Sequence, residues 1–156
     1  MHGRRGVMND WKDDLEVYLK EQKKTKRELK QKKEEMQQSV KLFMQGEVLT
    51  AFDDLKKEFK KHKREVEIDN KKDWAAILIK KNKHKEFVYE ININMDDGKL
   101  LASKSVYLPN DKGKLKLGVE GKIRASANSM QIARITKDDI IADFLEAYKS
   151  ATRIKS

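Results

Sequence analysis

The sequence predicts an α+β protein with a long N-terminal helical or coiled-coil arm, then a helix, a four- to five-stranded antiparallel sheet and a C-terminal helix. Residues 11–66 place apolar or core-like side chains in steps of four and three, which is helical spacing. Residues 74–123 instead show apolar runs and two-residue alternation between turn residues, which is typical of strands. Strands joined by such short loops pair antiparallel, because a parallel pair needs a long crossover.

This change of period divides the chain into two expected segments. Residues 1–45 are expected to form a flexible start plus a charged heptad helix, and residues 46–156 a small α+β domain. Asp10 can cap a helix that begins at Trp11, with Asp13 in its first turn. Gly46 is expected to end that helix, because glycine weakens a helix by roughly 1 kcal/mol relative to alanine.

A second amphipathic helix is expected from Val48 to about Val66. A turn-rich passage should follow at residues 67–70. The core-facing positions of this second helix carry more apolar side chains than those of the first helix. They are Val48, Phe52, Leu55, Phe59, His62 and Val66.

Four segments read as strands, and a fifth is short. Residues 74–79 form a continuous apolar run, and residues 87–95 alternate strictly. Asp96, Asp97 and Gly98 predict a hairpin turn before a third strand at residues 100–108. Residues 115–123 alternate again, and residues 130–135 are expected to form the short fifth strand.

The last element is expected to be a helix that completes the core. Thr136 and Asp139 have the spacing of a capping box, in which each side chain binds the other residue's backbone N–H. The residues that follow give a wide apolar face, composed of Ile140, Ile141, Phe144, Leu145 and Tyr148.

The first helix carries the most specific pattern in the chain. With Leu15 at heptad position a, the candidate coiled-coil seam consists of Trp11, Leu15, Tyr18, Leu29, Met36 and Phe43. The g positions are Asp14, Glu21, Glu28 and Glu35, and the e positions are Lys12, Leu19, Lys26, Lys33 and Val40. In a parallel pair, g of one helix faces the following e of its partner, so Glu21 would meet Lys26 and Glu28 would meet Lys33. This predicts parallel self-association, and the alternatives are an arm folded back on its own domain or a solvated single helix.

No pattern of catalytic residues is present, so an enzyme is not expected, nor are a catalytic residue, a metal or a cofactor. The histidines His2, His62 and His84 are scattered and lack metal-ligand spacing. The glycines form neither a phosphate-binding loop nor a dinucleotide fingerprint, and no serine has a nucleophile-elbow setting.

The net charge of +10 introduces a second hypothesis, binding of nucleic acid through a basic sheet or helix face. The candidate phosphate-binding residues are Lys57, Lys60, Lys61 and Arg64 on one side of the second helix, and Lys116, Lys122 and Arg124 on one face of the fourth strand. No known nucleic-acid-binding motif accompanies them. A solvated surface explains the same charges.

The composition points to a cytoplasmic protein. There is no cysteine, no apolar run long enough to span a bilayer and no apolar segment behind the two N-terminal arginines. Neither helix has the apolar and basic faces of a membrane-surface helix, so no membrane partner is expected. The sequence therefore predicts a non-enzymatic protein–protein interaction or assembly module, with nucleic-acid binding as the alternative.

Overall fold

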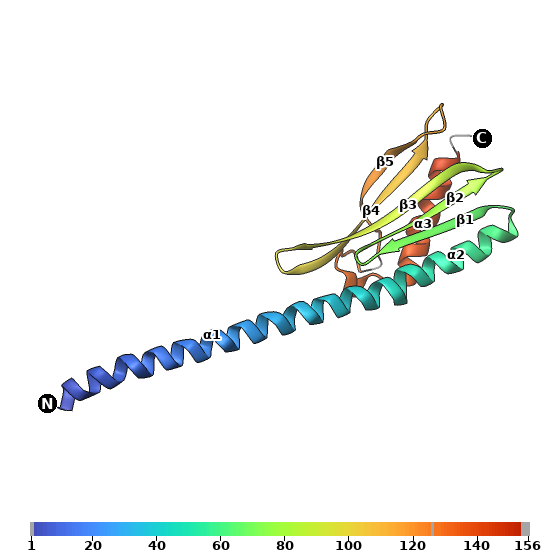
Figure 1. The fold of residues 1–156 in the computed structure, drawn as a ribbon. Coiled ribbons are helices and arrows are strands. Elements are labelled where there is room, and N and C mark those ends of the chain that lie inside the picture. The colour runs from blue at the N-terminus through green and yellow to red at the C-terminus, as the bar shows by residue number, and fades with distance from the viewer. Residues whose placement is uncertain (1, 126, 154–156) are drawn as a thin grey trace. The chain divides into compact units, whose positions relative to one another are not determined.

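The computed structural model describes residues 2–125 and 127–153, with side chains from residue 10 onward. It confirms the predicted layout of a long N-terminal helix, an antiparallel sheet and a C-terminal helix (Figure 1). The elements in order are α1 (His2–Phe43), the π-helical turn η1 (Met44–Val48), α2 (Leu49–Lys61), β1 (Glu65–Lys71), β2 (Trp74–Lys81), β3 (His84–Asp96), β4 (Lys99–Pro109), β5 (Leu115–Lys122), the 3₁₀ turn η2 (Ile132–Arg134) and α3 (Lys137–Arg153).

The chain divides into two compact units, Met1–Gln38 and Ser39–Ser156. The sequence predicts a division after residue 45. The difference arises because the last turn of α1 already belongs to the core of the second unit. Phe43 and Met44 are buried there, and Val40 packs against them.

The helix does not end at Gly46, so the prediction from sequence is wrong at this point. Helical backbone continues from α1 through η1 into α2, with no turn between them. Gly46 lies inside η1, and its carbonyl oxygen accepts a hydrogen bond from the Thr50 hydroxyl at 2.6 Å. A π turn inserts an extra residue into the helix, and Met44 and Val48 of this turn are buried. At its other end, α1 begins at His2, so Asp10 lies within the helix and does not cap it.

The five strands form one sheet in the order β1-β2-β3-β4-β5, and every neighbouring pair is antiparallel. The predicted hairpin turn between β3 and β4 is present. Asp97 and Gly98 adopt φ values of 50° and 73°, as the favoured two-residue hairpin turns require. The two edge strands are short and charged, and β5 carries a register shift opposite Val106 and Tyr107.

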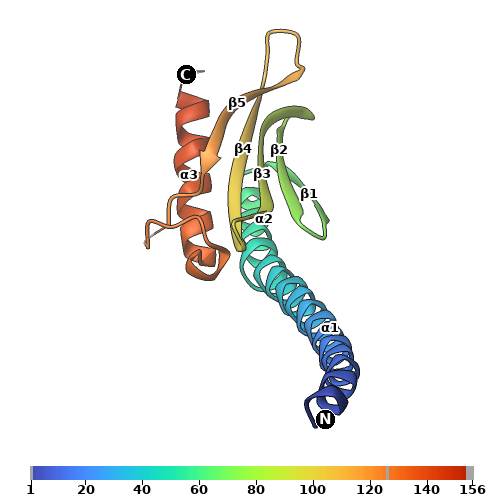
Figure 2. The same cartoon turned by 90° about the vertical axis from the view of Figure 1, so that its left-hand side faces the viewer.

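Helices α2 and α3 cover the same face of the sheet, as Figure 1 and the turned view in Figure 2 show. Aromatic rings from three elements meet in this layer. Phe144 of α3 packs edge-on against Phe59 of α2 and against Phe87 and Tyr89 of β3, with ring centroids 5.2–5.8 Å apart. Tyr148 stacks on Phe144 at 6.1 Å. The aromatic cluster is thus the centre of the core.

Two segments have a different secondary structure from the one that the sequence predicts. Residues 65–71 form β1, where the sequence suggests a helix end and a turn. The helix ends earlier because Lys63, with φ of 60°, reverses the chain, and Val66 and Ile68 then face the core. Residues 130–135 form no fifth strand of their own. Gln131 makes a single bridge to Leu101, and the 3₁₀ turn η2 follows.

The capping box of α3 is confirmed by two reciprocal hydrogen bonds. The Thr136 N–H donates to Asp139 Oδ2 at 3.0 Å, and the Asp139 N–H donates to Thr136 Oγ1 at 3.2 Å. Both bonds satisfy backbone donors near the start of the helix, which would otherwise lack a partner.

We predict that Phe144→Ala destabilises the protein by about 3–5 kcal/mol, because the Phe144 side chain is fully buried and its loss leaves a cavity. Chemical denaturation followed by circular dichroism measures this change. Leu117→Ala is the matched control, since Leu117 is 51% exposed and its truncation should have little effect. Equal stability of the Phe144 variant and the wild type would contradict a core role for α3.

Candidate functional site

The described side chains of the first unit bury almost nothing. Every side chain from residue 10 to residue 35 is exposed. The predicted seam lies open along this stretch, with Trp11, Leu15, Tyr18 and Leu29 exposed by 56%, 48%, 56% and 62%. Exposure alone does not single out the seam, because Val17 and Leu19 of the same helix are exposed by 54% and 51%.

The last two residues of the predicted seam are less exposed than the other four. Met36 is half-buried, and Phe43 is buried in the core of the second unit. Phe43 is therefore not available to a partner, and the exposed stripe ends before it. Polar contacts support the helix along the stripe itself. Gln22 donates a hydrogen bond to the Tyr18 hydroxyl at 2.9 Å, and Lys20 forms an ion pair with Glu16 at 3.4 Å.

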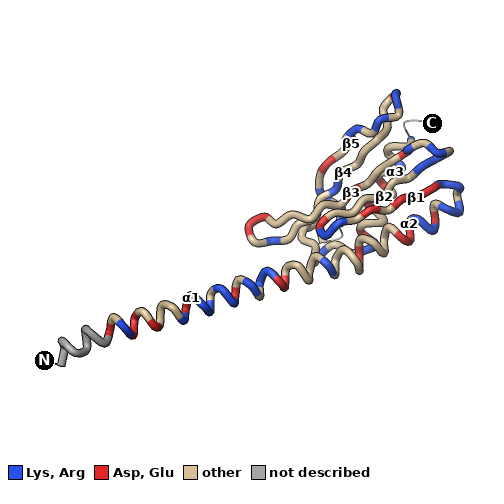
Figure 3. The backbone as a smooth tube through the Cα atoms, viewed as in Figure 1, with Lys and Arg blue, Asp and Glu red and all other residues tan. Residues whose placement is uncertain are grey.

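Of the basic residues predicted on the second helix, Lys60 and Lys61 lie in the last turn of α2, where Figure 3 shows basic residues gathered. Lys57 and Lys60 are exposed. Lys61 forms an ion pair with Glu58 at 3.1 Å. Arg64 lies beyond the helix, where its guanidinium contacts the His62 carbonyl and lies 3.8 Å from Glu86.

The three basic residues predicted on one strand face do not share a face. Lys116 pairs with Leu108 and Lys122 pairs with Ser103. Leu108 and Ser103 are an odd number of residues apart on β4, so their side chains point to opposite sides of the sheet. A bulge between the two lysines shifts the alternation on which the prediction depends. Arg124 lies after β5 and pairs with Glu146 of α3 at 2.9 Å.

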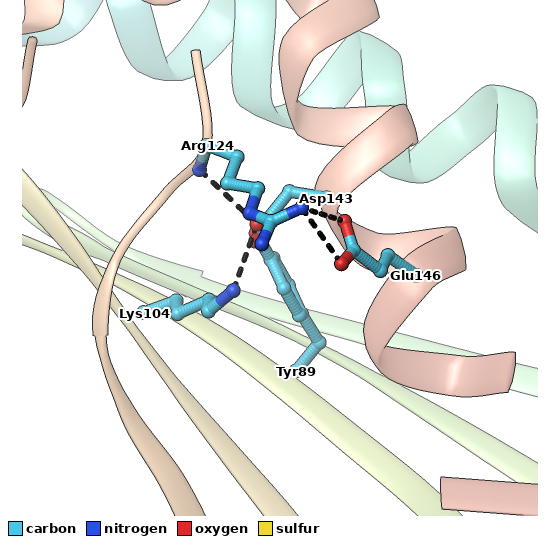
Figure 4. A network of polar contacts seen from close by, with 5 residues as sticks. All are labelled: Tyr89, Lys104, Arg124, Asp143 and Glu146. Carbon is cyan, nitrogen blue, oxygen red and sulfur yellow. Dashed lines mark hydrogen bonds and ion pairs between the residues drawn. The ribbon is translucent and has the colours of Figure 1, made fainter. Parts of the chain in front are cut away.

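A polar network that the sequence does not predict lies under α3 (Figure 4). The Asp143 side chain is 1% exposed and accepts three hydrogen bonds. The donors are the Tyr89 hydroxyl at 2.7 Å, Lys104 Nζ at 2.7 Å and the Arg124 backbone N–H at 3.1 Å. The Asp143 clamp, as we call these four residues, thus connects α3 to β3, to β4 and to the segment after β5.

The electrostatics of the clamp favour a structural role. Burial raises the pKa of Tyr89 well above its ordinary value, and the negative charge of Asp143 contributes in the same direction. Tyr89 therefore stays protonated and serves as a donor to the carboxylate. Because internal donors occupy both oxygens of Asp143, the carboxylate is engaged in holding the fold together.

One signal in the sequence could have revealed this clamp. Lys104 interrupts the apolar face of β4, between Ala102 and Val106, which are both buried. A lysine at such a position needs a buried anionic partner. Asp143 supplies it from the buried face of α3, beside Phe144.

No match to this chain was found among protein-family models, curated proteins or solved structures. Among the described side chains, those of residues 10–125 and 127–153, no group of three or more acidic or histidine side chains lies close enough to hold a metal ion. In the same part of the chain, no helix combines the length and apolar character that crossing a bilayer requires.

Removing the charge of Asp143 is expected to destabilise the fold. Asp143→Asn keeps the shape of the side chain but leaves the Lys104 ammonium buried without its anion, at a cost of about 3–5 kcal/mol. Glu146→Gln is the matched control on the same helix, because its ion pair with Arg124 is exposed and should contribute at most about 1 kcal/mol. Urea denaturation of the three proteins measures both effects. A loss below about 1 kcal/mol for Asp143→Asn would show that the clamp does not stabilise the fold.

Proposed function

We propose that this protein is a non-enzymatic cytoplasmic assembly module that self-associates through α1 as a parallel coiled coil. The observation that carries the proposal is the exposed apolar stripe of Trp11, Leu15, Tyr18 and Leu29 at heptad spacing. A helix of this length that buries nothing in its own unit gains stability chiefly by packing its apolar side against another surface.

The flanking charges supply the orientation. When two copies run parallel, Glu21 at g meets Lys26 at e of the partner helix, and Glu28 meets Lys33. Asp14 and Glu35 face Leu19 and Val40 instead. Antiparallel copies would place acid against acid and lysine against lysine. Gln22, Thr25, Lys32 and Ser39 fill the middle of the seam with polar side chains, so the affinity should be modest and the association should depend on concentration.

Sedimentation equilibrium of the full chain tests the seam. Leu15→Lys places a charge in the apolar layer and should weaken association by at least about tenfold, equivalent to ~1.4 kcal/mol. Val17→Lys is the matched control, because Val17 is 54% exposed on the same helix but lies off the seam. A monomeric wild-type chain, or equally weakened association for the two variants, would rule out the proposed seam.

The absence of native cysteine allows a separate test of orientation. In a parallel pair, position 22 faces its own copy, so the variant Gln22→Cys should form a disulfide-linked dimer under mild oxidation. Lys20→Cys points away from the seam and should not. If Gln22→Cys fails to cross-link in a chain that dimerises, the pair is not parallel and in register.

A second candidate function is polyanion binding, and one observation favours it over the interpretation as a solvated surface. Glu65 pairs with Lys80, and Lys81 pairs with His84. These pairings place the lysine-rich turn after β2 at the same end of the sheet as the basic end of α2. Figure 3 shows the two basic segments near one another.

The salt dependence of binding to a DNA duplex tests this candidate with two triple variants of equal charge. Replacing Lys57, Lys60 and Lys61 with glutamine should reduce the salt slope by about 0.9 for each DNA phosphate that the variant no longer neutralises. The same replacement of Lys116, Lys122 and Arg124, which do not share a face, should change the slope less. Equal slopes for both variants, or no binding at low salt, would contradict a dedicated surface at the end of α2.

A further inference from the structure

The face of the sheet that α2 and α3 leave open carries a line of carboxylates. Ile91 and Val106 face the helices, so the residues next to them on each strand face the other way (Figure 2). The register places five such residues side by side, and from β1 to β5 they are Asp69, Ala76, Glu90, Ser105 and Glu120. The three acids, which we call the acidic row, are spaced at roughly 10 Å, because neighbouring strands lie about 4.8 Å apart.

A serine hydroxyl without a partner lies within the acidic row. Ser105 is more than nine-tenths buried, with an exposure of 8%. Within residues 10–125 and 127–153, its hydroxyl makes no hydrogen bond. The acids on either side, Glu90 and Glu120, add to burial in raising the pKa of Tyr107, the next residue along this face of β4. Two carboxylates and a free hydroxyl so close together favour a ligand that brings several N–H donors.

The lysines of the open face have other neighbours. In the line of residues next to the acidic row, Lys71 lies over a tryptophan ring and Lys122 donates to an asparagine. Further along the strands, Lys80 pairs with Glu67 at 2.8 Å, and Lys85 lies opposite Lys80. Among the described side chains, no ion pair involves an acid of the row. The acidic row therefore keeps its charge for a partner.

Helix α1 presents basic side chains at a matching interval. Helical residues seven positions apart are separated by about 10.5 Å along the axis. Lys23 and Lys30 are such a pair, and Arg27 lies between them on the same side of the helix. All three side chains are exposed. The end of α2 is also basic, but α2 ends at Lys61 and contains no two basic residues seven positions apart.

This basic side of α1 is the back of the predicted seam. In the heptad frame of the seam, Lys23 and Lys30 occupy b and Arg27 occupies f, positions that point away from the partner helix. Between Glu16 and Glu34, no acid occupies a b, c or f position. The basic side is available whether or not two arms form a coiled coil, so a contact through it does not rest on the proposed self-association.

We propose that the acidic row binds the basic side of α1 from a second copy of this chain. The ammonium groups of Lys23 and Lys30 pair with the two carboxylates that flank Ser105. The Arg27 guanidinium donates to the Ser105 hydroxyl between them, since a guanidinium offers five N–H donors. The two surfaces match in sign and in spacing. In a chain that also pairs through the seam, this contact joins the pairs into larger assemblies.

Zero-length cross-linking of the full chain tests the contact. A carbodiimide joins a carboxylate to an amine only where the two groups touch. We mix ¹⁴N-labelled and ¹⁵N-labelled chains and identify the linked peptides by mass spectrometry. Links from Glu90 or Glu120 to Lys23 or Lys30 are expected to combine the two isotopes. Links confined to one isotope, or links from these acids to other lysines, would overturn the proposal.

Sedimentation velocity in a Leu15→Lys background separates this contact from the seam. Replacing both Glu90 and Glu120 with glutamine should weaken the remaining association about tenfold, equivalent to ~1.4 kcal/mol. The matched control replaces Glu58 and Glu146 with glutamine, because these exposed acids lie on the helices of the other face and their loss changes the net charge equally. Equal weakening by both double variants, or a background chain that stays monomeric at low salt, would contradict the acidic row as a binding surface.

Complementary charge reversals distinguish direct pairing from damage to the fold. In the same background, one chain carries Lys23→Glu and Lys30→Glu, and another carries Glu90→Lys and Glu120→Lys. Each chain alone should associate at least about tenfold more weakly, because its two surfaces then have the same sign. An equal mixture should recover the association, since each chain supplies the surface that the other lacks. A mixture that associates no more tightly than its components would refute the proposed pairing.

Discussion

The packing of Phe144 against rings from α2 and β3 is the contact on which the rest of the domain depends. A single side chain thereby joins both helices to the sheet, and T-shaped aromatic pairs add specific geometry to the burial of apolar area. Asp143, the adjacent residue, adds a directional connection to the other half of the sheet. The two neighbours fix α3 in position and in rotation, and the surface features of the domain follow from that placement.

The strands with clear alternation can be predicted from the sequence because one face of each is buried. Residues 87–95 show this best, since Phe87, Tyr89, Ile91 and Ile93 all lie in the core. β1 is not predicted from the sequence because only Val66 and Ile68 mark its core-facing side. The residues that follow, Asp69 and Asn70, resemble a turn. The prediction at Gly46 is wrong because tertiary burial of Met44 and Val48 outweighs the local cost of glycine in a helix.

Candidate site residues are harder to predict because they depend on register and on distant partners. Lys116 and Lys122 have the spacing of one strand face, and only the bulge in β5 separates them. The Asp143 clamp joins residues from positions 89, 104, 124 and 143, which no local pattern connects. The seam on α1 rests on heptad spacing, which is local, and it stays a prediction. Every side chain from residue 10 to residue 35 is exposed, so exposure does not distinguish the seam from the rest of the helix.

The open edges of the sheet have a consequence for how copies of this chain can meet. β1 exposes a backbone edge flanked by Glu65, Glu67 and Asp69, and β5 combines Lys116, Glu120 and Lys122 with a bulge. Charges and bulges on edge strands oppose the addition of a further strand from another molecule. The domain is therefore protected against edge-to-edge aggregation into continuous sheets. A concentrated solution of this protein should therefore resist fibril formation, even though the backbone edges of β1 and β5 are open.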